Sequence, residues 1–379
     1  MAKDKTSENL KREKVEPVFK YYSTGSTLMD LAISNKGDGG VAANGRITHI
    51  YGANSTAKTV LAHEILGACQ RSGGYSAFID AEGTLDCDRA DLFGLQLCNW
   101  EDEQYQEETA IKEETAYNTP KGKDKAVKAF LSKTIDENKN FVCLHTPSIE
   151  QMFDGTFNTF IEAVEEERIP KNVVIGVDSL SSLPSETELT NDLADATYGT
   201  SRAKQMSTGF RKYIKALNKN NISVVFVDQT RDSIGIGKNN KVSGGNALKF
   251  YASTRIWLNN PKRIFNKHEQ TIGVEIDFIV EKNKVAPPFR TGKLCVLFDI
   301  GIDNVRANIN WLLENTKNIE STLKQAGSWF SWGEKKAGQG LDKTIMFFEE
   351  NDLEKELEDE VIRVWNILYE SPKRKKRYE

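Results

Sequence analysis

The chain has 379 residues, of which 39% are hydrophobic and 28% are charged. This length excludes a single small module, and the composition is typical of a soluble globular protein with one large domain or two ordinary ones. The formal net charge of −4 excludes no class of partner, because the distribution of charge matters more than its sum.

Cysteine usage and membrane signals bear on the compartment. The sequence holds no apolar run of about 18 residues, the length that could cross a bilayer. Its first stretch, MAKDKTSENLKREKVEP, has no apolar core of the signal-peptide kind. The five cysteines, at 69, 87, 98, 143 and 295, are widely spaced and include no pair at the separation that metal sites favour. We therefore expect free thiols, a cytoplasmic location and no membrane partner.

In chain order, residues 1–16 are polar and highly charged and predict a solvated arm or a short helix, and we expect the N-terminal arm to span residues 1–21. Between Arg46 and Ile300, short apolar runs rich in β-branched and aromatic residues alternate with helical patterns. Such runs predict strands covered on both faces, and their alternation with helices predicts a mostly parallel α/β sheet. Ligands on such sheets bind at the carboxyl ends of strands. The runs are RITHIYG, YSAFIDAEG, NVVIGVDSL, ISVVFVDQT, STRIWLNN, VEIDFIVEKNK and KLCVLFDIG.

The first of these runs leads through GANSTAKT into a helical pattern. A phosphate loop needs backbone N–H groups, a lysine for the β- and γ-phosphates and a hydroxyl for Mg²⁺, all at a helix N-terminus. Ala57 stands where such a loop carries glycine, which is tolerable in a right-handed backbone and damaging if the position needs a positive φ. The alternative is a small-residue loop before a capped helix. The candidate nucleotide contacts are Gly52, Ala53, Asn54, Ser55, Thr56, Ala57, Lys58 and Thr59.

Three other runs end in acidic residues. AFIDAEG ends in Asp80 and Glu82, VVIGVDSL in Asp178 and Ser179, and SVVFVDQT in Asp228 and Gln229. Carboxylates at strand ends can hold Mg²⁺, and an adjacent amide can orient a water or contact a γ-phosphate. Any one acidic strand end could equally cap the next helix. Three acidic strand ends together with a phosphate loop favour a role in metal binding or catalysis over helix capping.

Two polar segments interrupt this pattern. Residues 99–140 include the acidic stretch EDEQYQEETAIKEE and predict an inserted, partly helical and exposed excursion. RDSIGIGKNNKVSGGN, residues 231–246, is rich in glycine and asparagine and predicts a flexible loop. Its basic residues suit the phosphates of a nucleic-acid strand, and the alternative is a solvated surface loop.

From Asn304 onward, helical patterns such as NINWLLENTKNIESTLKQAG and DLEKELEDEVIRVWNILYE predict a small second domain over residues 304–370. The last residues, 371–379, form the basic tail SPKRKKRYE. This tail could capture duplex DNA, but a solubilising tail or a nuclear-type signal fits the same residues.

Segments spread along the chain in order resemble the RecA-type homologous recombinases. STGSTLMDLAI resembles the entry to the family's core, GANSTAKT its phosphate loop, FIDAEGTLD its catalytic-glutamate segment and VVIGVDSLSSL its Walker B strand. FVDQTRDSIG and GGNALKFYAS resemble the arms of its second DNA-binding loop. VEKNKVAPPF resembles the segment that reaches a neighbour's ATP, and AGSWFSWGEKKAGQG the hairpin of its C-terminal domain. The likeness covers residues 22–370.

The resemblance implies the fold and its division. We expect an α/β, RecA-type P-loop ATPase core with a mostly parallel twisted sheet flanked by helices over residues 22–303. The N-terminal arm and a small α+β C-terminal domain would flank it.

The resemblance also implies an ATP- and Mg²⁺-dependent, DNA-dependent ATPase. Lys58 and Thr59 would hold phosphates and Mg²⁺, Asp178 would support the metal, and Glu82 would position the attacking water. Gln229 would sense the γ-phosphate and transmit its presence to the loop that follows it.

Further positions would serve the base and the neighbouring subunit. Asp86 and Arg89 would lie at the adenine, where many relatives carry an aromatic residue and guanidinium stacking could replace it. Lys282 and Lys284 would act in trans on the adjacent subunit's nucleotide, as arginine fingers do elsewhere. Lys249 and Phe250 would pack against a neighbour in a helical filament.

The implied partners are single-stranded DNA, duplex DNA and further copies of the chain, with single-strand-binding and mediator proteins as additional candidates. A first DNA-binding loop is expected between Pro184 and Arg202 and a second over residues 231–246. The residues implied to contact DNA are Arg202, Arg231, Lys238, Lys241, Gly244, Gly245 and Asn246.

The resemblance predicts an ATP-dependent strand-exchange recombinase that coats single-stranded DNA and pairs it with homologous duplex. Ala57, the insertion at 99–140, the short arm and the basic tail depart from the cellular pattern and point to a phage-encoded member. Two alternatives stay open. One is a hexameric helicase or motor that shares the core, and the other is a nucleotide-switched DNA-binding filament or mediator protein with little hydrolysis.

Overall fold

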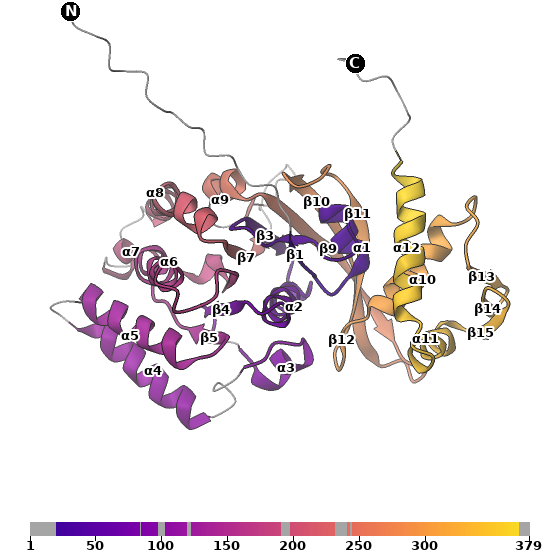
Figure 1. Ribbon diagram of the computed structural model, residues 1–379, viewed down its shortest axis with the longest axis horizontal. Helices are drawn as coiled ribbons and strands as arrows, with labels where there is room; N and C mark the ends of the chain where they lie inside the picture. The colour runs from indigo at the N-terminus through magenta and orange to yellow at the C-terminus, as the bar shows by residue number, and fades with distance from the viewer. Residues whose placement is uncertain are drawn as a thin grey trace, which may run out of the picture.

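The computed structural model describes residues 20–83, 85–97, 103–119, 123–190, 198–231, 241–242 and 245–370. A large twisted sheet runs through the molecule with helices on either side, and a smaller unit carrying the C-terminal helices lies at one end (Figure 1). The predicted α/β class with a mostly parallel sheet is confirmed. The domain boundaries expected from the sequence stay predictions.

The central sheet has ten strands in the described part of the chain. Its parallel portion has the order β9-β3-β7-β6-β4-β5. These strands are β3 (Ile47–Gly52), β4 (Tyr75–Asp80), β5 (Phe141–Leu144), β6 (Val173–Asp178), β7 (Ile222–Arg231) and β9 (Thr254–Phe265). Every residue of β3, β4, β5 and β6 is buried, which explains why these strands are continuous apolar runs.

The other side of the sheet is antiparallel. β10 (Thr271–Asn283) pairs with β9 and with β11 (Thr291–Leu297), and β12 (Gly301–Ile302) closes this edge. The short β8 (Lys241–Val242) pairs with the end of β7. A separate two-stranded sheet joins β1 (Tyr21–Tyr22) to β2 (Val41–Ala42). Hairpin connections therefore extend the parallel sheet beyond β9.

Helices connect the strands of the parallel portion. The phosphate-loop run leads into α2, and α8 leads into β7, where Phe210 packs edge-to-face on Phe226 at 5.8 Å between ring centroids. Ser26 is the N-cap of helix α1, and its hydroxyl accepts the Met29 N–H at 3.4 Å. The core helices are α1 (Thr27–Ser34), α2 (Lys58–Arg71), α3 (Cys87–Leu92), α6 (Asn158–Glu165), α7 (Glu186–Thr190), α8 (Tyr198–Lys219) and α9 (Gly245–Tyr251), with a π-helix at Gln151–Phe157 and a 3₁₀ turn at Leu180–Ser182.

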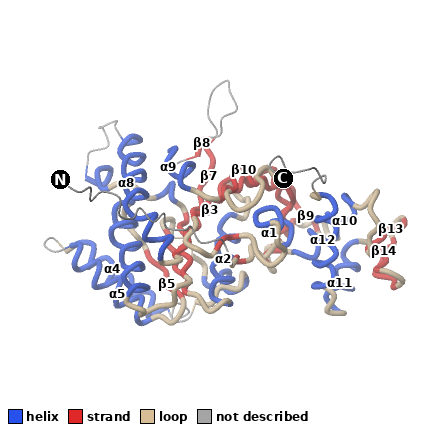
Figure 2. The backbone as a smooth tube through the Cα atoms, turned by 45° about the horizontal axis from the view of Figure 1, so that its top comes forward, coloured by secondary structure: helices blue, strands red, loops and turns tan. Residues whose placement is uncertain are grey.

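The polar insertion forms a helical hairpin, α4 (Glu103–Asn118) and α5 (Lys123–Glu137), whose helices lie side by side in both views (Figures 1 and 2). The prediction of helix is confirmed, but the prediction of an exposed excursion is wrong for α5. Val127, Leu131 and Ile135 are buried and belong to the main core. Their spacing of four residues puts them on one face of the helix, which the acidic composition of the neighbouring stretch concealed.

The C-terminal unit combines helices with a three-stranded antiparallel sheet, β13 to β15. Its α12 packs back on the core, where Trp365 Nε1 donates to Asn35 Oδ1 at 3.1 Å and the Arg290 guanidinium lies over the Trp365 ring at 5.6 Å. The elements are α10 (Asn304–Asn315), β13 (Leu323–Ala326), β14 (Trp329–Trp332), β15 (Lys335–Gln339), α11 (Leu341–Glu350) and α12 (Glu354–Leu368). No helix among the described residues has the length and apolarity needed to span a bilayer.

Candidate nucleotide-binding site

Neighbouring strands of the parallel sheet bring the predicted site residues to one edge. The register pairs Gly52 with Gln229, Asp178 with Val227, and Asp80 with Asp178. The loop after β3, the acidic ends of β4 and β6 and the amide at the end of β7 therefore lie side by side. This is the edge where α/β sheets bind ligands.

The loop between β3 and α2 is closed by its own hydrogen bonds. The carbonyl of Ala53 accepts the Thr56 hydroxyl at 2.8 Å and the Lys58 ammonium at 2.7 Å. Gly52 is required by packing, since a Cβ there would lie 2.2 Å from the Leu258 carbonyl oxygen on β9. The lysine thus points back over the loop, where it can exchange a carbonyl oxygen for phosphate oxygens.

Ala57 adopts the left-handed helical region, with φ 54° and ψ 29°, immediately before α2. Ser55 also has a positive φ, of 59°. From the sequence we expect alanine to be tolerated at this position only if the backbone is right-handed. The backbone is left-handed, so the alanine is in the conformation that disfavours it. An L-residue in this region costs about 1–2 kcal/mol, which glycine avoids.

Lys58, Thr59 and Asp178 form the centre of the site. Lys58 is only 8% exposed, and burial lowers its pKa while the carboxylates of Asp178, Glu82 and Asp228 counteract that shift. The Thr59 hydroxyl donates to Asp178 Oδ2. Burial raises the pKa of Asp178 to about 6, and the bond from Thr59 opposes the shift. A buried ammonium beside paired hydroxyl and carboxylate oxygens at a helix N-terminus fits a Mg²⁺–nucleotide.

The described residues hold no cluster of three or more His, Cys, Asp or Glu side chains that could bind a metal unaided. Mg²⁺ commonly binds through one or two carboxylates together with substrate phosphates. Thr59 and Asp178 fit that pattern, so the metal at this site would depend on the nucleotide.

The two carboxylates at the end of β4 have different roles. Asp80 is buried and accepts the backbone N–H of Leu85 at 2.7 Å and of Glu82 at 3.3 Å, so it fixes the turn that follows its strand. Glu82 is exposed, and its Oε1 accepts the hydroxyls of Ser179 at 2.7 Å and Ser182 at 3.0 Å. Of the pair, Glu82 alone has an exposed side chain.

Behind Gln229, a chain of buried polar side chains crosses the sheet. Asp228 Oδ2 lies 3.0 Å from His49 Nε2, and Arg255 Nε donates to His49 Nδ1 at 3.3 Å. The Arg255 guanidinium lies 3.3 Å from Glu281, which also accepts the Tyr51 hydroxyl. Because Nδ1 accepts, His49 carries its proton on Nε2 and donates it to Asp228. Burial lowers the pKa of His49 and keeps the ring neutral.

Sequence reasoning missed His49, Arg255 and Glu281. The available signal was a histidine inside RITHIYG and an arginine inside STRIWLNN, which are polar residues within apolar strands. Buried polar groups need partners, so each was a candidate for a network. Which partners they would find was not readable from either strand alone.

The residues expected at the adenine lie at a short helix. Asp86 caps α3, with its carboxylate accepting the Arg89 N–H at 3.2 Å, and both side chains are exposed. The helix cap is a structural role for Asp86. Contact with adenine stays a prediction for both residues.

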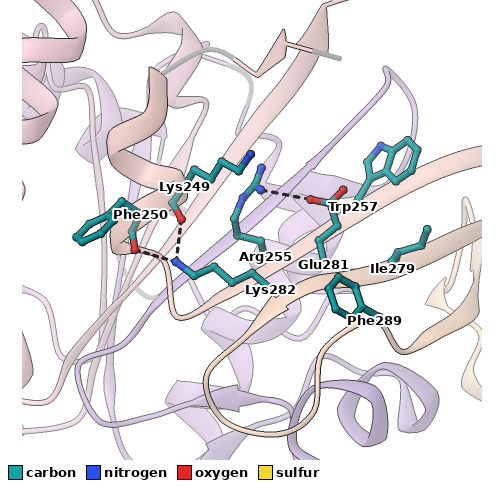
Figure 3. A pocket seen from close by; sticks show the side chains of 8 residues that line it. All are labelled: Lys249, Phe250, Arg255, Trp257, Ile279, Glu281, Lys282 and Phe289. Atoms are coloured by element: carbon teal, nitrogen blue, oxygen red, sulfur yellow. Dashed lines mark hydrogen bonds and ion pairs between the residues drawn. The ribbon is translucent and has the colours of Figure 1, made fainter. Parts of the chain in front are cut away.

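The residues expected at the subunit interface line an open pocket of about 720 Å³ beside β9 and β10. Figure 3 shows Lys282 reaching the backbone carbonyls of Lys249 and Phe250, each at 2.8 Å, while the Phe250 ring points away from it. Phe250 and Phe289 are 73% and 75% exposed. Burial, with Lys284 and Arg255 nearby, lowers the pKa of Lys282 to about 8. Lys284 is exposed on the same segment.

Among the predicted DNA contacts, Arg202 has a well-defined environment. Its guanidinium donates to the carbonyls of Leu180 at 2.8 Å and Ser181 at 3.2 Å, so it is bound to the turn after β6. Lys238 and Gly244 lie outside the described residues, as do the tail and residues 1–19 of the arm. The backbone of Arg231, Lys241, Gly245 and Asn246 is described in β7, β8 and α9, but their side chains fall outside the description.

Comparison with protein-family models adds independent evidence. The RecA N-terminal domain matches residues 6–107 and 164–303, and the RecA C-terminal domain matches residues 318–366. The unmatched stretch between 107 and 164 contains most of α4, all of α5, strand β5 of the central sheet and the π-helix.

Comparison with curated proteins finds relatives over nearly the whole chain. The chain is 30% identical to Protein RecA of Trichodesmium erythraeum, over 92% of this chain and 80% of the relative. It is 32% identical to Protein RecA of Wolinella succinogenes, over 92% and 82% respectively. The RecA protein of Thermus thermophilus is 32% identical over 84% of this chain and 78% of its own length. These relatives are bacterial, so the expectation of a phage-encoded member gains no support from them.

Proposed function

The chain belongs to the RecA family, and from that premise we propose that it is an ATP-dependent recombinase that assembles on single-stranded DNA and pairs it with homologous duplex. Family membership supports a recombinase role in general. Strand exchange, the filament and the individual residue roles are our proposal for this chain.

The observation that carries the proposal is the convergence of Lys58, the Thr59–Asp178 pair and Glu82 at one edge of the parallel sheet. A phosphate loop alone is a common feature of nucleotide-binding proteins. Here a carboxylate held by two hydroxyls lies near enough to the loop lysine to influence its pKa. This arrangement provides for hydrolysis as well as binding.

Each residue has a definite task in the proposed reaction. Lys58 and the N–H groups at the start of α2 would bind the phosphates, and Thr59 and Asp178 would hold Mg²⁺, which supplies charge neutralisation at the phosphates. Glu82 would orient the attacking water toward the γ-phosphate. Gln229, at the end of β7, would contact the γ-phosphate and report its presence to the segment that follows.

The pocket beside β9 and β10 would receive an adjacent subunit. Its exposed aromatics, Phe250 and Phe289, provide apolar area, and Lys282 and Lys284 would place positive charge at the neighbour's phosphates. Sharing one ATP between two subunits would link nucleotide binding to filament assembly.

The proposed DNA contacts lie in the two segments that follow β6 and β7. The segment after β7 is rich in glycine and cannot present a rigid set of side chains to base edges. Its contacts should therefore go mainly to phosphates, which makes binding salt-dependent and nearly independent of sequence. Base pairing between the strands would then read homology.

Steady-state ATP hydrolysis with and without single-stranded DNA, at low and moderate salt, tests the proposal. Strong stimulation by the strand, weakening as salt rises, is the expected result. A closed ring seen by electron microscopy in place of an open filament would support the hexameric motor. The Lys58→Ala variant is the control, since it should lose nucleotide-dependent assembly.

A second candidate is a filament protein that binds nucleotide as an assembly switch and hydrolyses little. The left-handed backbone of Ala57 favours it, because a strained phosphate loop could bind ATP without holding the geometry that turnover needs. The same assay separates the two candidates. Filaments that require ATP but show no turnover with or without DNA would favour the switch.

A further inference from the structure

Arg202 lies near the start of α8, at the end of the first of the two segments expected to bind DNA. Its side chain is half-buried, and three hydrogen bonds join its two terminal nitrogens to the carbonyls of Leu180 and Ser181, at 2.8, 3.2 and 3.2 Å. A planar guanidinium that grips two successive carbonyls fixes a backbone turn. This is not the geometry of an arginine extended toward a phosphate.

The turn to which Arg202 is hydrogen-bonded also provides the hydroxyl groups that donate to Glu82. Ser179 and Ser182 both donate to Glu82 Oε1, at 2.7 and 3.0 Å. The hydroxyl of Ser179 also lies 2.8 Å from those of Ser181 and Ser182, so the three serines form one hydrogen-bonded cluster. Glu82 itself is exposed on a loop, and without these donors its carboxylate would be free to adopt other rotamers.

We propose that Arg202 is a positioning residue for ATP hydrolysis, which holds the turn at residues 180–182 so that Ser179 and Ser182 keep the Glu82 carboxylate in place. The path runs from the first turns of α8 through two backbone carbonyls and two hydroxyls to the carboxylate. This inference rests on the proposed function, because it takes Glu82 as the residue that orients water.

Arg202→Gln separates a positioning role from a DNA contact. Misplacing a catalytic group by about 1 Å can cost about a hundredfold in rate, so we expect kcat at saturating single-stranded DNA to fall by about tenfold or more. KM for ATP and the apparent affinity for DNA should stay nearly unchanged. A phosphate contact would show the reverse: DNA affinity would fall, its salt dependence would weaken by about one charge and kcat at saturation would be intact.

Two further variants sharpen the test. Arg202→Lys keeps the positive charge but loses the planar guanidinium. The value of kcat should stay low if the hydrogen bonds to the two carbonyls matter, and it should recover if charge alone matters. Lys204→Gln is the matched control, since Lys204 is exposed two residues further along α8 and should leave kcat unchanged.

Ser182→Ala tests the path independently of Arg202 and keeps the inference falsifiable if Arg202→Gln does not fold. Removing this hydroxyl should lower kcat, and Ser182→Thr, which restores one, should recover most of it. Combined with Arg202→Gln, the loss should be less than the product of the two single losses, because both act on the same carboxylate.

The outcomes point to different failures. Lost DNA affinity with intact kcat in Arg202→Gln, or fully multiplicative losses in the double variant, would overturn the inference and leave the proposed function standing. No turnover in the parent chain would overturn the proposed function and this inference with it. Normal turnover in Glu82→Ala would overturn this inference and the role proposed for Glu82, because another carboxylate would then orient the water.

Discussion

Replacing Ala57, the N-cap residue of α2, by glycine should stabilise the protein, although glycine destabilises helix interiors. The gain is release of the left-handed strain, about 1–2 kcal/mol for an L-residue. Two losses oppose it. Glycine gives the unfolded chain more conformational entropy, which costs about 0.4–1 kcal/mol of stability. Removing the half-buried methyl group of Ala57 also costs burial energy, by less than the value for a fully buried methylene, which is about 0.8 kcal/mol. The balance is a stabilisation of about 0.5 kcal/mol.

Urea unfolding of the nucleotide-free chain measures this balance. ATP affinity should change by less than about twofold, because the left-handed backbone is already present in the free loop and a ligand gains only from differences between states. Ser55→Gly is the matched control, since Ser55 is exposed and has a similar positive φ. Ala57→Val should destabilise, because a β-branched residue is a marked outlier in this region.

The strain argument fails if Ala57→Gly unfolds at lower urea than the parent, or if Ala57→Val is as stable as the parent. Either result would mean that the loop relaxes to a right-handed backbone in solution. An ATP affinity that rises about tenfold in Ala57→Gly would locate the strain in the bound state only.

The remaining predictions concern the carboxylate, the shared interface and the buried network. Glu82→Ala should retain ATP and DNA binding and lose hydrolysis, measured by nucleotide binding beside steady-state turnover; normal turnover would mean that another carboxylate orients the water. Mixing Lys282→Ala with Lys58→Ala subunits should restore part of the ATPase activity that each lacks alone, because a mixed interface can combine an intact phosphate loop with an intact Lys282. No rescue would indicate that each site is complete within one chain. Because the pKa of Lys282 is lowered to about 8, its positive charge is present below that pH and is lost above it, so ATP-dependent assembly followed by light scattering should weaken as pH rises through about 8 and weaken less in Lys282→Arg. His49→Phe should lower the free energy of unfolding in urea by about 3 kcal/mol, because it removes the side-chain donor of the buried Asp228 carboxylate. His49→Gln, which keeps an N–H, should lower it less, and equal losses would show that packing and not the hydrogen bond is at stake.

Local patterns were sufficient for most of the fold. RITHIYG, YSAFID, NVVIGVD and ISVVFVD are strands of the parallel sheet, because an apolar run bounded by turn residues is stable only when both faces are covered. The helix after GANSTAKT and the helices of the C-terminal unit follow from the same short-range periodicity. The antiparallel extension beyond β9 and the packing of α5 were less readable, because both depend on which distant surface is available to bury an apolar face.

The sequence by itself determined the kinds of group present at the site: a loop lysine and threonine, strand-end carboxylates and an amide near the end of β7. Strand ends bring such groups to one edge whatever the intervening sequence, so their proximity could be predicted. The division of work among them could not. Asp80 and Glu82 are two residues apart, yet one is buried against backbone N–H groups and the other is held by serines of another strand end.

Only the three-dimensional structure revealed the backbone conformation of Ala57 and the hydrogen-bond partners of His49 and Arg202. Ala57 has a left-handed backbone where the loop enters α2. His49 contacts Asp228, 179 positions further along the chain, because β3 and β7 are neighbours in the sheet. Arg202, expected at DNA, is bound to a turn 21 and 22 positions earlier. Hydrogen bonds between distant segments depend on how strands and helices are placed in space, and a linear pattern of residue types does not contain that placement.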